Sequence, residues 1–483
     1  MIKNYKWILG GLILVNIGLF VFANRDEALG NSATVRGRDV EIIVDDFSGG
    51  ITNEDNVDDF RFFQYTQNFD VTSNKLVPYR DSEAGDDANE DRDIYGFTAA
   101  SSTRLYACGE NTVSGSSFAP AVFYKNDVDL TNNVWVNPTS SSTSNFVQRE
   151  LCIFYKNYIY GSRGGDTDTL WRYGDITQAS PTMADPWQTI NTTQPWVQGV
   201  WHSKDDNLYL AHDNIVAKYD GGTAEFISEA LVLPTDRIIS SIVEYGDYLA
   251  IGTYGIGGDL SSKVYFWDRN TSLVTVSDAL DWGFDQLRTL TVLDGTLIGI
   301  SQSRADADLT SSESFDFKIT FRYFNGNIAQ EFFHLDSDRS PSSSLGVKGF
   351  KYRNAFYFPL RIFIDGVPRE GVWKIYRPNL TSSFKIVFDR TLDNNTDPAA
   401  NTALRIRDIF VWGDYMFIAY SSGLTGSISK TNDLPSYTAS STIESVFYGD
   451  GIHQNILRSI GVMTEPMPSG GQIDILYKMD GER

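Results

Sequence analysis

The chain has 483 residues, enough to bury a large core, and a formal net charge of −22. A surface this acidic repels phosphate backbones, so the composition argues against nucleic-acid binding through a basic face and against direct readout of bases. Aromatic residues make up 13% of the chain and glycines number 40, a mixture that favours twisted strands and tight turns over long helices.

An apolar segment begins the sequence. Lys3 and Lys6 precede an uncharged run from Trp7 to Ala23, which is at the short end for a membrane-spanning helix and also fits a secretory signal. We therefore expect residues 1–24 to form a hydrophobic helix that is a signal peptide or a membrane anchor, with membrane attachment through residues 7–23. Both alternatives place the rest of the chain outside the cytoplasm. The remaining alternatives are a buried helix and a misassigned start codon.

Residues 25–90 are predicted to be an acidic N-terminal arm with little regular structure. One strand is expected at residues 40–44, followed by a turn. Residues 84–93 are rich in Asp and Glu and should form a solvated loop.

Seven segments between about Asp91 and Lys430 share one design: a half-apolar strand, a polar turn and a second strand richer in apolar and aromatic residues. The turns hold pairs such as Lys-Asn, Gly-Asp and Asp-Gly, most of which suit tight hairpins. The segments are 94–109, 146–161, 197–211, 238–252, 287–300, 347–360 and 406–420. A third strand follows in most units, at 122–127, 170–175, 216–221, 264–268, 319–326, 372–377 and, more weakly, 427–430.

These hairpins cannot bury their apolar faces alone, whereas radial stacking buries both faces of every sheet. Their spacing, roughly 40 to 60 residues, suits one four-stranded blade per unit. The sequence therefore predicts an all-β chain with a seven-bladed β-propeller over residues 91–440. A β-sandwich or a solenoid array is the alternative architecture.

The pattern changes at the C-terminal end. Strands are expected within 441–447, 455–463 and 472–477, so residues 441–483 should form a small C-terminal β appendage. The sequence stops at Arg483, shortly after the third strand and an Asp-Gly pair that suits a hairpin turn. A partner strand would normally follow, so either the natural product is longer or the tail pairs with a neighbouring chain.

The two cysteines, Cys108 and Cys152, belong to neighbouring repeats. They form no CxxC pair and no Cys/His cluster, so the sequence does not support a structural zinc site. They can pair with each other, but free buried thiols are the interpretation that the sequence favours.

Candidate catalytic and metal-binding residues are few. His202 and His212 flank one hairpin, where they could share a metal, but no Cys or third His accompanies them and a turn or surface role is favoured. Acidic residues recur at the hairpin turns, where turn chemistry explains them without catalysis; they are Asp206, Asp247, Asp294 and Asp414. Two further pairs suggest calcium ligands or, preferably, solvated loops; they are Asp166 with Asp168 and Asp306 with Asp308.

Tryptophans in the strand patterns offer rings for sugar stacking, but core packing is the favoured interpretation. They are Trp171, Trp267, Trp373 and Trp412. The sequence contains no GxSxG, HExxH or P-loop motif. We therefore predict no catalytic, cofactor-binding or metal-binding residues, no cofactor and no enzymatic activity.

Two regions resemble structural proteins of tailed phages. Residues 47–80 contain Phe47-Ser-Gly-Gly-Ile51, Gln67-Asn-Phe-Asp70 and Leu76-Val-Pro-Tyr-Arg80, which resemble the opening of phage tail nozzle and hub proteins. Residues 441–477 contain Ile443-Glu-Ser-Val-Phe447 and Ile473-Asp-Ile-Leu-Tyr477, similar to the strands that follow the propeller in those proteins. The resemblance implies a non-enzymatic assembly part, often in a ring around the DNA channel.

The sequence thus predicts a structural or interaction propeller, most consistent with a phage tail or neck component in the virion. Its partners would be protein subunits of a larger assembly, including further copies in a ring. The alternative is an exported or membrane-anchored propeller that binds, or hydrolyses, cell-surface glycans.

Overall fold

The structure is a computed structural model of the chain. It describes residues 19–24, 39–44, 50–51, 62–67, 69–71, 77–78, 82–84, 94–101, 103–114, 117–126, 135–140, 151–163, 169–189, 198–222, 226–256, 260–272, 279–303, 317–337, 349–364, 367–378, 382–391, 404–413, 415–422, 425–431, 441–445, 456–462 and 474–475. All regular elements within these ranges are β-strands. Within them, no helix of the length and apolarity needed to cross a membrane is found.

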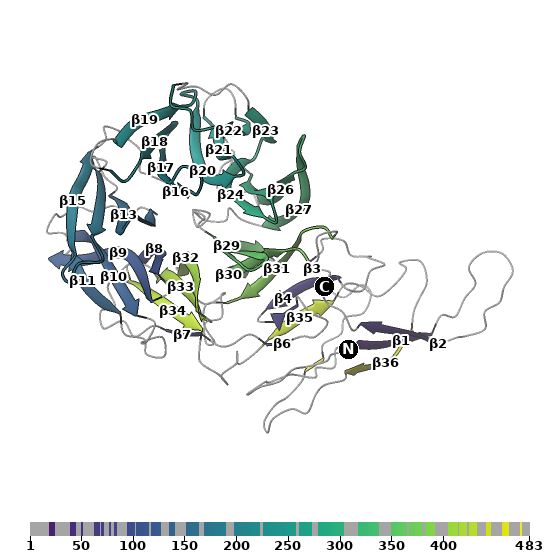
Figure 1. Ribbon diagram of the computed structural model, residues 1–483. Helices are drawn as coiled ribbons and strands as arrows, with labels where there is room; N and C mark the ends of the chain where they lie inside the picture. Colours follow the sequence, from purple (N-terminus) through teal and green to yellow (C-terminus); the bar gives the residue numbers. More distant parts are fainter. Residues whose placement is uncertain are drawn as a thin grey trace. The chain divides into compact units, whose positions relative to one another are not determined.

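Seven four-stranded sheets form the blades of a β-propeller (Figure 1). Blade 1 contains β8 (Ile94–Ser101), β9 (Arg104–Ser114), β10 (Ser117–Asn126) and β11 (Val136–Ser140). Blade 2 contains β12 (Cys152–Tyr155), β13 (Tyr158–Arg163), β14 (Thr169–Gly174) and β15 (Thr182–Thr189). Blade 3 contains β16 (Gln198–His202), β17 (Asn207–His212), β18 (Ile215–Tyr219) and β19 (Phe226–Val232).

The remaining blades follow the same plan. Blade 4 contains β20 (Arg237–Tyr245), β21 (Tyr248–Gly255), β22 (Ser262–Trp267) and β23 (Ala279–Gly283). Blade 5 contains β24 (Gln286–Leu293), β25 (Thr296–Gln302), β26 (Phe317–Phe324) and β27 (Ala329–Ser337). Blade 6 contains β28 (Phe350–Tyr352), β29 (Ala355–Ile364), β30 (Val367–Tyr376) and β31 (Lys385–Arg390). Blade 7 contains β32 (Leu404–Trp412), β33 (Tyr415–Ser422) and β34 (Thr425–Thr431), with β7 (Ser82–Ala84) as its fourth strand.

The seven predicted hairpins are confirmed as the first two strands of the seven blades, and the predicted third strands are confirmed as well. Turn chemistry explains the agreement, because several turn residues adopt the positive φ that tight hairpins require. Examples are Asn157 (φ 66°), Asp294 (φ 50°) and Gly295 (φ 75°). The β-propeller, rather than a sandwich or solenoid, is therefore the architecture of the chain.

Both faces of a blade are buried, as β21 illustrates. Its Leu249 and Ile251 pack in one apolar cluster with Tyr209 of blade 3. Ala250, between them, packs in another cluster with Leu290 of blade 5. Side chains alternate between the two faces of a strand. A strand that is buried on both faces therefore has a continuous run of apolar residues instead of an alternating pattern.

Blade 7 takes its fourth strand from the region predicted to be an acidic arm. The strand β7 is only three residues long, Ser82–Ala84, and the propeller prediction of 91–440 excluded it. A segment as short and polar as Ser-Glu-Ala carries no periodicity, so its pairing with β34 is decided by the open edge of blade 7. Closing that edge removes an exposed row of backbone polar groups.

The chain divides into two compact units, and most of the propeller belongs to the larger one, Ala84–Glu370 with Thr396–Lys430. The smaller unit combines Met1–Glu83, Gly371–Asn395 and Thr431–Arg483. Within it, β1 (Leu19–Asn24) lies between β2 (Asp39–Val44) and β36 (Ile456–Val462), and β4 (Phe62–Gln67) lies between β3 (Gly50–Ile51) and β35 (Thr442–Ser445). A third pair joins β5 (Phe69–Asp70) and β6 (Val77–Pro78).

The predicted N-terminal helix is corrected over the residues that the structure describes there, because 19–24 form a strand. Leu19-Phe-Val-Phe22 combines aromatic and branched side chains, which suit strands, and both neighbouring strands pair with it. Residues 1–18 lie outside the described ranges. The strand expected at 40–44 is confirmed as β2, and two of the three C-terminal strands are confirmed as β35 and β36. Because these two pair with N-terminal strands, the smaller unit is built from both ends of the chain.

Hydrogen bonds between blades satisfy N–H groups of the first strands. Each first strand lies at the edge of its sheet, so N–H groups on its open side have no partner strand. Side chains of the preceding blade accept them at several boundaries: Phe154 N–H to Thr98 Oγ1 (3.1 Å), Ile242 N–H to Gln198 Oε1 (3.2 Å), Leu290 N–H to Ser241 Oγ (2.9 Å), Ile406 N–H to Glu370 Oε1 (2.9 Å) and Phe97 N–H to Asp408 Oδ2 (2.7 Å).

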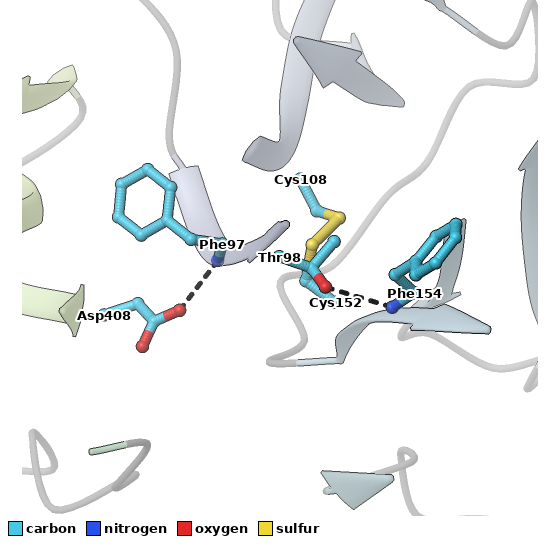
Figure 2. The surroundings of a disulfide bond; sticks show 6 residues. All are labelled: Phe97, Thr98, Cys108, Cys152, Phe154 and Asp408. Carbon is cyan, nitrogen blue, oxygen red and sulfur yellow. Dashed lines mark hydrogen bonds between the residues drawn. A yellow bond between two sulfur atoms is a disulfide. The ribbon is translucent and has the colours of Figure 1, made fainter. Parts of the chain in front are cut away.

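Blade 1 is bound to both of its neighbours at adjacent residues of β8 (Figure 2). Phe97 donates its N–H to the buried Asp408 of blade 7, and Thr98 accepts the N–H of Phe154 in blade 2. A disulfide between Cys108 of β9 and Cys152 of β12 adds a covalent link to blade 2. The first blade is therefore attached on one side by a carboxylate and on the other by a disulfide.

The prediction of free thiols is wrong, since Cys108 and Cys152 are bonded. Their Cα atoms lie 5.8 Å apart, in the range that a disulfide spans. The two residues are separated by 44 positions, and only the stacking of blade 2 on blade 1 brings them together. The sequence alone does not show how the blades pack, so it could not show that the two cysteines lie close enough to bond.

Replacing Asp408 with Ala should lower the free energy of unfolding by about 3 kcal/mol, because it leaves two buried N–H donors without an acceptor. Asp408 accepts the N–H of Ile409 through Oδ1 (2.9 Å) as well as that of Phe97. Urea denaturation of the full chain measures the loss. Asp408→Asn, which keeps one carbonyl acceptor, should lose less, and Asp336→Ala at an exposed site is the matched control. Equal stability of Asp408→Ala and the control would contradict the role of this carboxylate.

The free energy of unfolding of the double variant Cys108→Ala/Cys152→Ala should be about 4 kcal/mol lower than that of the wild type. The reason is that a cross-link over a loop of this length reduces the entropy of the unfolded chain. Denaturant titrations with and without reductant measure the effect. Reductant should destabilise the wild type and leave the double variant unchanged. A wild type that loses nothing on reduction would show that the link contributes little.

Candidate functional site

Polar side chains gather at one end of blades 2, 3 and 4. In a four-stranded antiparallel blade, the turn after the first strand and the connection after the third strand lie at the same end of the strands. We call this end of the blades the turn face; its described residues in these blades are 156–157, 175–181, 203–206, 220–222, 246–247 and 268–272, together with the strand residues within two positions of them. It holds His202, Asp206 and Asp247, three of the residues that the sequence singled out.

Asp206 joins blade 3 to blade 2. Its Oδ1 accepts the indole N–H of Trp201 (2.9 Å), and its Oδ2 lies 3.0 Å from Nζ of Lys156. The Tyr155 hydroxyl donates to the Asp206 carbonyl (2.5 Å), and Lys156 Nζ also donates to the carbonyl of Asp220 (2.7 Å). The hydrogen bond from Lys156, followed by that from Trp201, lowers the pKa of Asp206, so this carboxylate is an anion near neutral pH.

Arg269 joins blade 4 to blade 3. Its Nη1 lies 2.6 Å from Nε2 of the fully buried His202, and its Nε lies 3.1 Å from Oδ2 of Asp205. Nη1 also donates to the carbonyl of Asp247 (2.5 Å). Asp205 accepts a further bond from the Tyr209 hydroxyl (2.6 Å). The guanidinium thus holds an imidazole, a carboxylate and a backbone carbonyl from two blades.

Both ring nitrogens of His202 have polar neighbours. A guanidinium only donates hydrogen bonds, so Nε2 turns its lone pair toward Arg269. Nδ1 lies 3.3 Å from the Lys204 backbone N–H and 3.4 Å from Oδ1 of Asp205. Burial, and then the Arg269 charge, lowers the pKa of His202. The ring is therefore neutral near pH 7, and its Nε2 lone pair faces the guanidinium.

Two more contacts tie the turns of blades 3 and 4 together. The Ser203 hydroxyl donates to Glu244 Oε1 (2.5 Å), and the ammonium of Lys204 pairs with Asp247. Among the described residues of the turn face and its flanking strand ends, the carboxylates are Asp175, Asp205, Asp206, Asp220, Glu244, Asp247 and Asp268. The cations are Lys156, Lys204, Lys218 and Arg269. The face therefore has an excess of negative charge.

The structure separates the two histidines that the sequence proposed as a pair. His202 is paired with Asn207 and Gln198 with Ala211, so His212 lies at the opposite end of the β16–β17 hairpin. At about 3.3 Å per residue, the five residues of β16 place them much too far apart to share a metal. Among the described residues, no three His, Cys, Asp or Glu side chains are grouped so that they could hold a metal ion.

The acidic turn residues have the role that turn chemistry predicts. Asp206 and Asp294 adopt φ values of 51° and 50°, and Asp247 follows the positive-φ Gly246 in its turn. The other acidic candidates lie outside the described residues; they are Asp166, Asp168, Asp306, Asp308 and Asp414.

The four tryptophans proposed for sugar stacking are core residues, which confirms the favoured interpretation. Trp171, Trp267 and Trp373 are at most 2% exposed and Trp412 is 8% exposed. Among the described residues, the exposed tryptophan is Trp201, with 46% of its surface accessible, and sequence reasoning missed it. Its position offered a signal, because it directly precedes a His and a polar turn at the end of a half-apolar strand.

His202 and His212 are both fully buried, so the surface role favoured for them is wrong. Burial lowers the pKa of His212 to about 4. In the unfolded chain a histidine titrates near its ordinary value of 6.5. Between these two values the unfolded chain binds the proton and the folded chain does not.

No protein-family model and no curated protein matches the chain. Among solved structures, a candidate 6-phosphogluconolactonase from Bacteroides uniformis is similar at 11% identity, with a TM-score of 0.42, over 77% of this chain and 99% of that chain. The β-propeller domain of the Trilobed protease from Pyrococcus furiosus is similar at 10% identity, TM-score 0.39, over 71% of this chain and 94% of its own. An α-L-arabinofuranosidase from Clostridium thermocellum is similar at 12% identity, TM-score 0.32, over 62% of this chain and 94% of its own.

The unfolding free energy should fall by about 3 kcal/mol more in the wild type than in His212→Gln as the pH drops from 6.5 toward 4. The sign follows from the lowered pKa of folded His212, because acid then favours the unfolded chain. Thermal and urea unfolding at a series of pH values measure both profiles. Carboxylates titrate in both chains, so the difference isolates the histidine. The prediction fails if His212→Gln keeps the wild-type slope.

Proposed function

We propose that the chain is a non-enzymatic interaction propeller that works as a structural part of a larger protein assembly. The observation that carries the proposal is how the turn face of blades 2–4 uses its polar groups. His202, Asp205 and Arg269 bind one another across a blade boundary, as do Asp206 and Lys156. Groups engaged in this way hold blades in place, while the exposed Trp201 ring remains available for contact.

The assembly proposed is a phage tail or neck, with the chain in the virion and further copies in a ring. The resemblance of residues 47–80 and 441–477 to tail nozzle and hub proteins supports it. The smaller unit also supports it, since both of these regions contribute strands to its sheets and the edges of such sheets are sites for adding a strand.

Mass spectrometry of purified particles tests this function. We expect the chain at a constant ratio to known tail components, and cross-links from it to neighbouring subunits. Periplasmic and membrane fractions of the same cells are the comparison. Recovery of the chain only in those fractions, or from cells that make no particles, would contradict the proposal.

The second candidate is an exported or membrane-anchored propeller that binds cell-surface glycans. The Cys108–Cys152 disulfide favours it, because such bonds persist mainly in oxidising compartments. The apolar run of residues 7–23 is then the signal or anchor. A mature chain lacking residues 1–23 would support export, and glycan hydrolysis that disappears when one Asp is replaced would contradict the non-enzymatic role.

A further inference from the structure

Trp201 is exposed, yet it is held in one orientation. Its indole N–H is bonded to Asp206, and Asp206 is bonded in turn to Lys156 and, through its carbonyl, to the Tyr155 hydroxyl. With 46% of its surface accessible, the residue presents apolar area that the fold could have covered. A ring oriented before contact loses little conformational entropy on binding, which is the property of an interface anchor.

The surroundings of the ring favour a cation. The face of an indole attracts cations through its quadrupole, and the Asp206 carboxylate at the ring edge adds negative charge. Among its described residues and flanking strand ends, the turn face carries seven carboxylates against four cations. Asp247 has 70% of its side chain exposed and Asp206 has 59%. Each is paired with one lysine of the face, and both carboxylates remain accessible from solvent to a partner's cation.

We propose that the turn face of blades 2–4 docks a basic segment of a protein partner, with an Arg or Lys cation lying on the ring of Trp201. The inference rests on the proposed interaction function and specifies the chemistry of the partner. Charge complementarity selects this occupant, since an acidic glycan or a phosphate backbone would be repelled by the same carboxylates. Arginine fits best, because its planar guanidinium stacks on the ring and bonds carboxylates at its edge.

The test uses the full chain and a ten-residue peptide of alternating Arg and Ser as probe, in titration calorimetry at two salt concentrations. Trp201→Ala should weaken binding about tenfold, in the range of a partly desolvated cation–π contact. Trp201→Phe, which keeps a ring with a weaker quadrupole, should lie between Trp201→Ala and the wild type. Asp247→Asn should weaken binding about threefold and reduce its salt dependence.

Matched controls separate this site from the general attraction of an acidic protein for a basic peptide. Phe284 is 80% exposed and lies in the connection from β23 to β24. This connection is at the end of the blade opposite the turn face, so Phe284→Ala should bind the peptide as the wild type does. Asp336→Asn removes one exposed charge in blade 5 and should also have no effect. Thermal unfolding of each variant confirms that it is folded.

Equal affinities for Trp201→Ala and Phe284→Ala, or losses that follow net charge alone, overturn the proposal. Binding of a neutral hexasaccharide that depends on Trp201, without peptide binding, assigns the ring to a sugar and overturns it too. Failure of the proposed function is a separate result. If particles contain the chain and incorporate Trp201→Ala as well as the wild type, only the proposed docking surface is rejected. If the chain is absent from particles, the assembly role is rejected.

Discussion

The open edge of the first strand is the constraint on which the propeller depends. In every blade this strand has only one neighbour, so its outward N–H groups must find acceptors elsewhere. At five of the blade boundaries that the structure describes, a side chain of the preceding blade supplies one, as Ser241 does for Leu290 and Asp408 for Phe97. The blades are thus joined by directional bonds as well as by apolar packing, and packing alone would not fix their register.

Local chemistry explains what could be predicted from the sequence. The hairpins were found because a turn such as Asp294-Gly295 is a property of a few adjacent residues. The strand β7, the disulfide between Cys108 and Cys152 and the exposed Trp201 could not be predicted, because each depends on which blade lies beside it. The helix expected at the N-terminus failed over residues 19–24 for the same reason, since an apolar run suits a helix or a strand until pairing partners decide.

The turn face holds side chains of the types found in catalytic sites, engaged in contacts with one another. The imidazole of His202 and the hydroxyl of Tyr209 each lie against the carboxylate of Asp205. Arg269 changes their surroundings, because its guanidinium lies against the imidazole Nε2 and pairs with the carboxylate. A buried, neutral histidine facing a cation has its proton affinity lowered, whereas a general base needs a pKa near the working pH and an open lone pair.

The same rigidity favours the turn face as a contact surface. Side chains on hairpin turns ordinarily lose entropy when a partner orders them, but the bonds from Asp206 to Trp201 and Lys156 have already fixed these. The negative charge not neutralised within the face then acts at long range and guides a basic partner toward an anchored ring. Ion pairs that contribute modestly to stability can therefore contribute to recognition, because they determine where the exposed aromatic surface and the remaining charge lie.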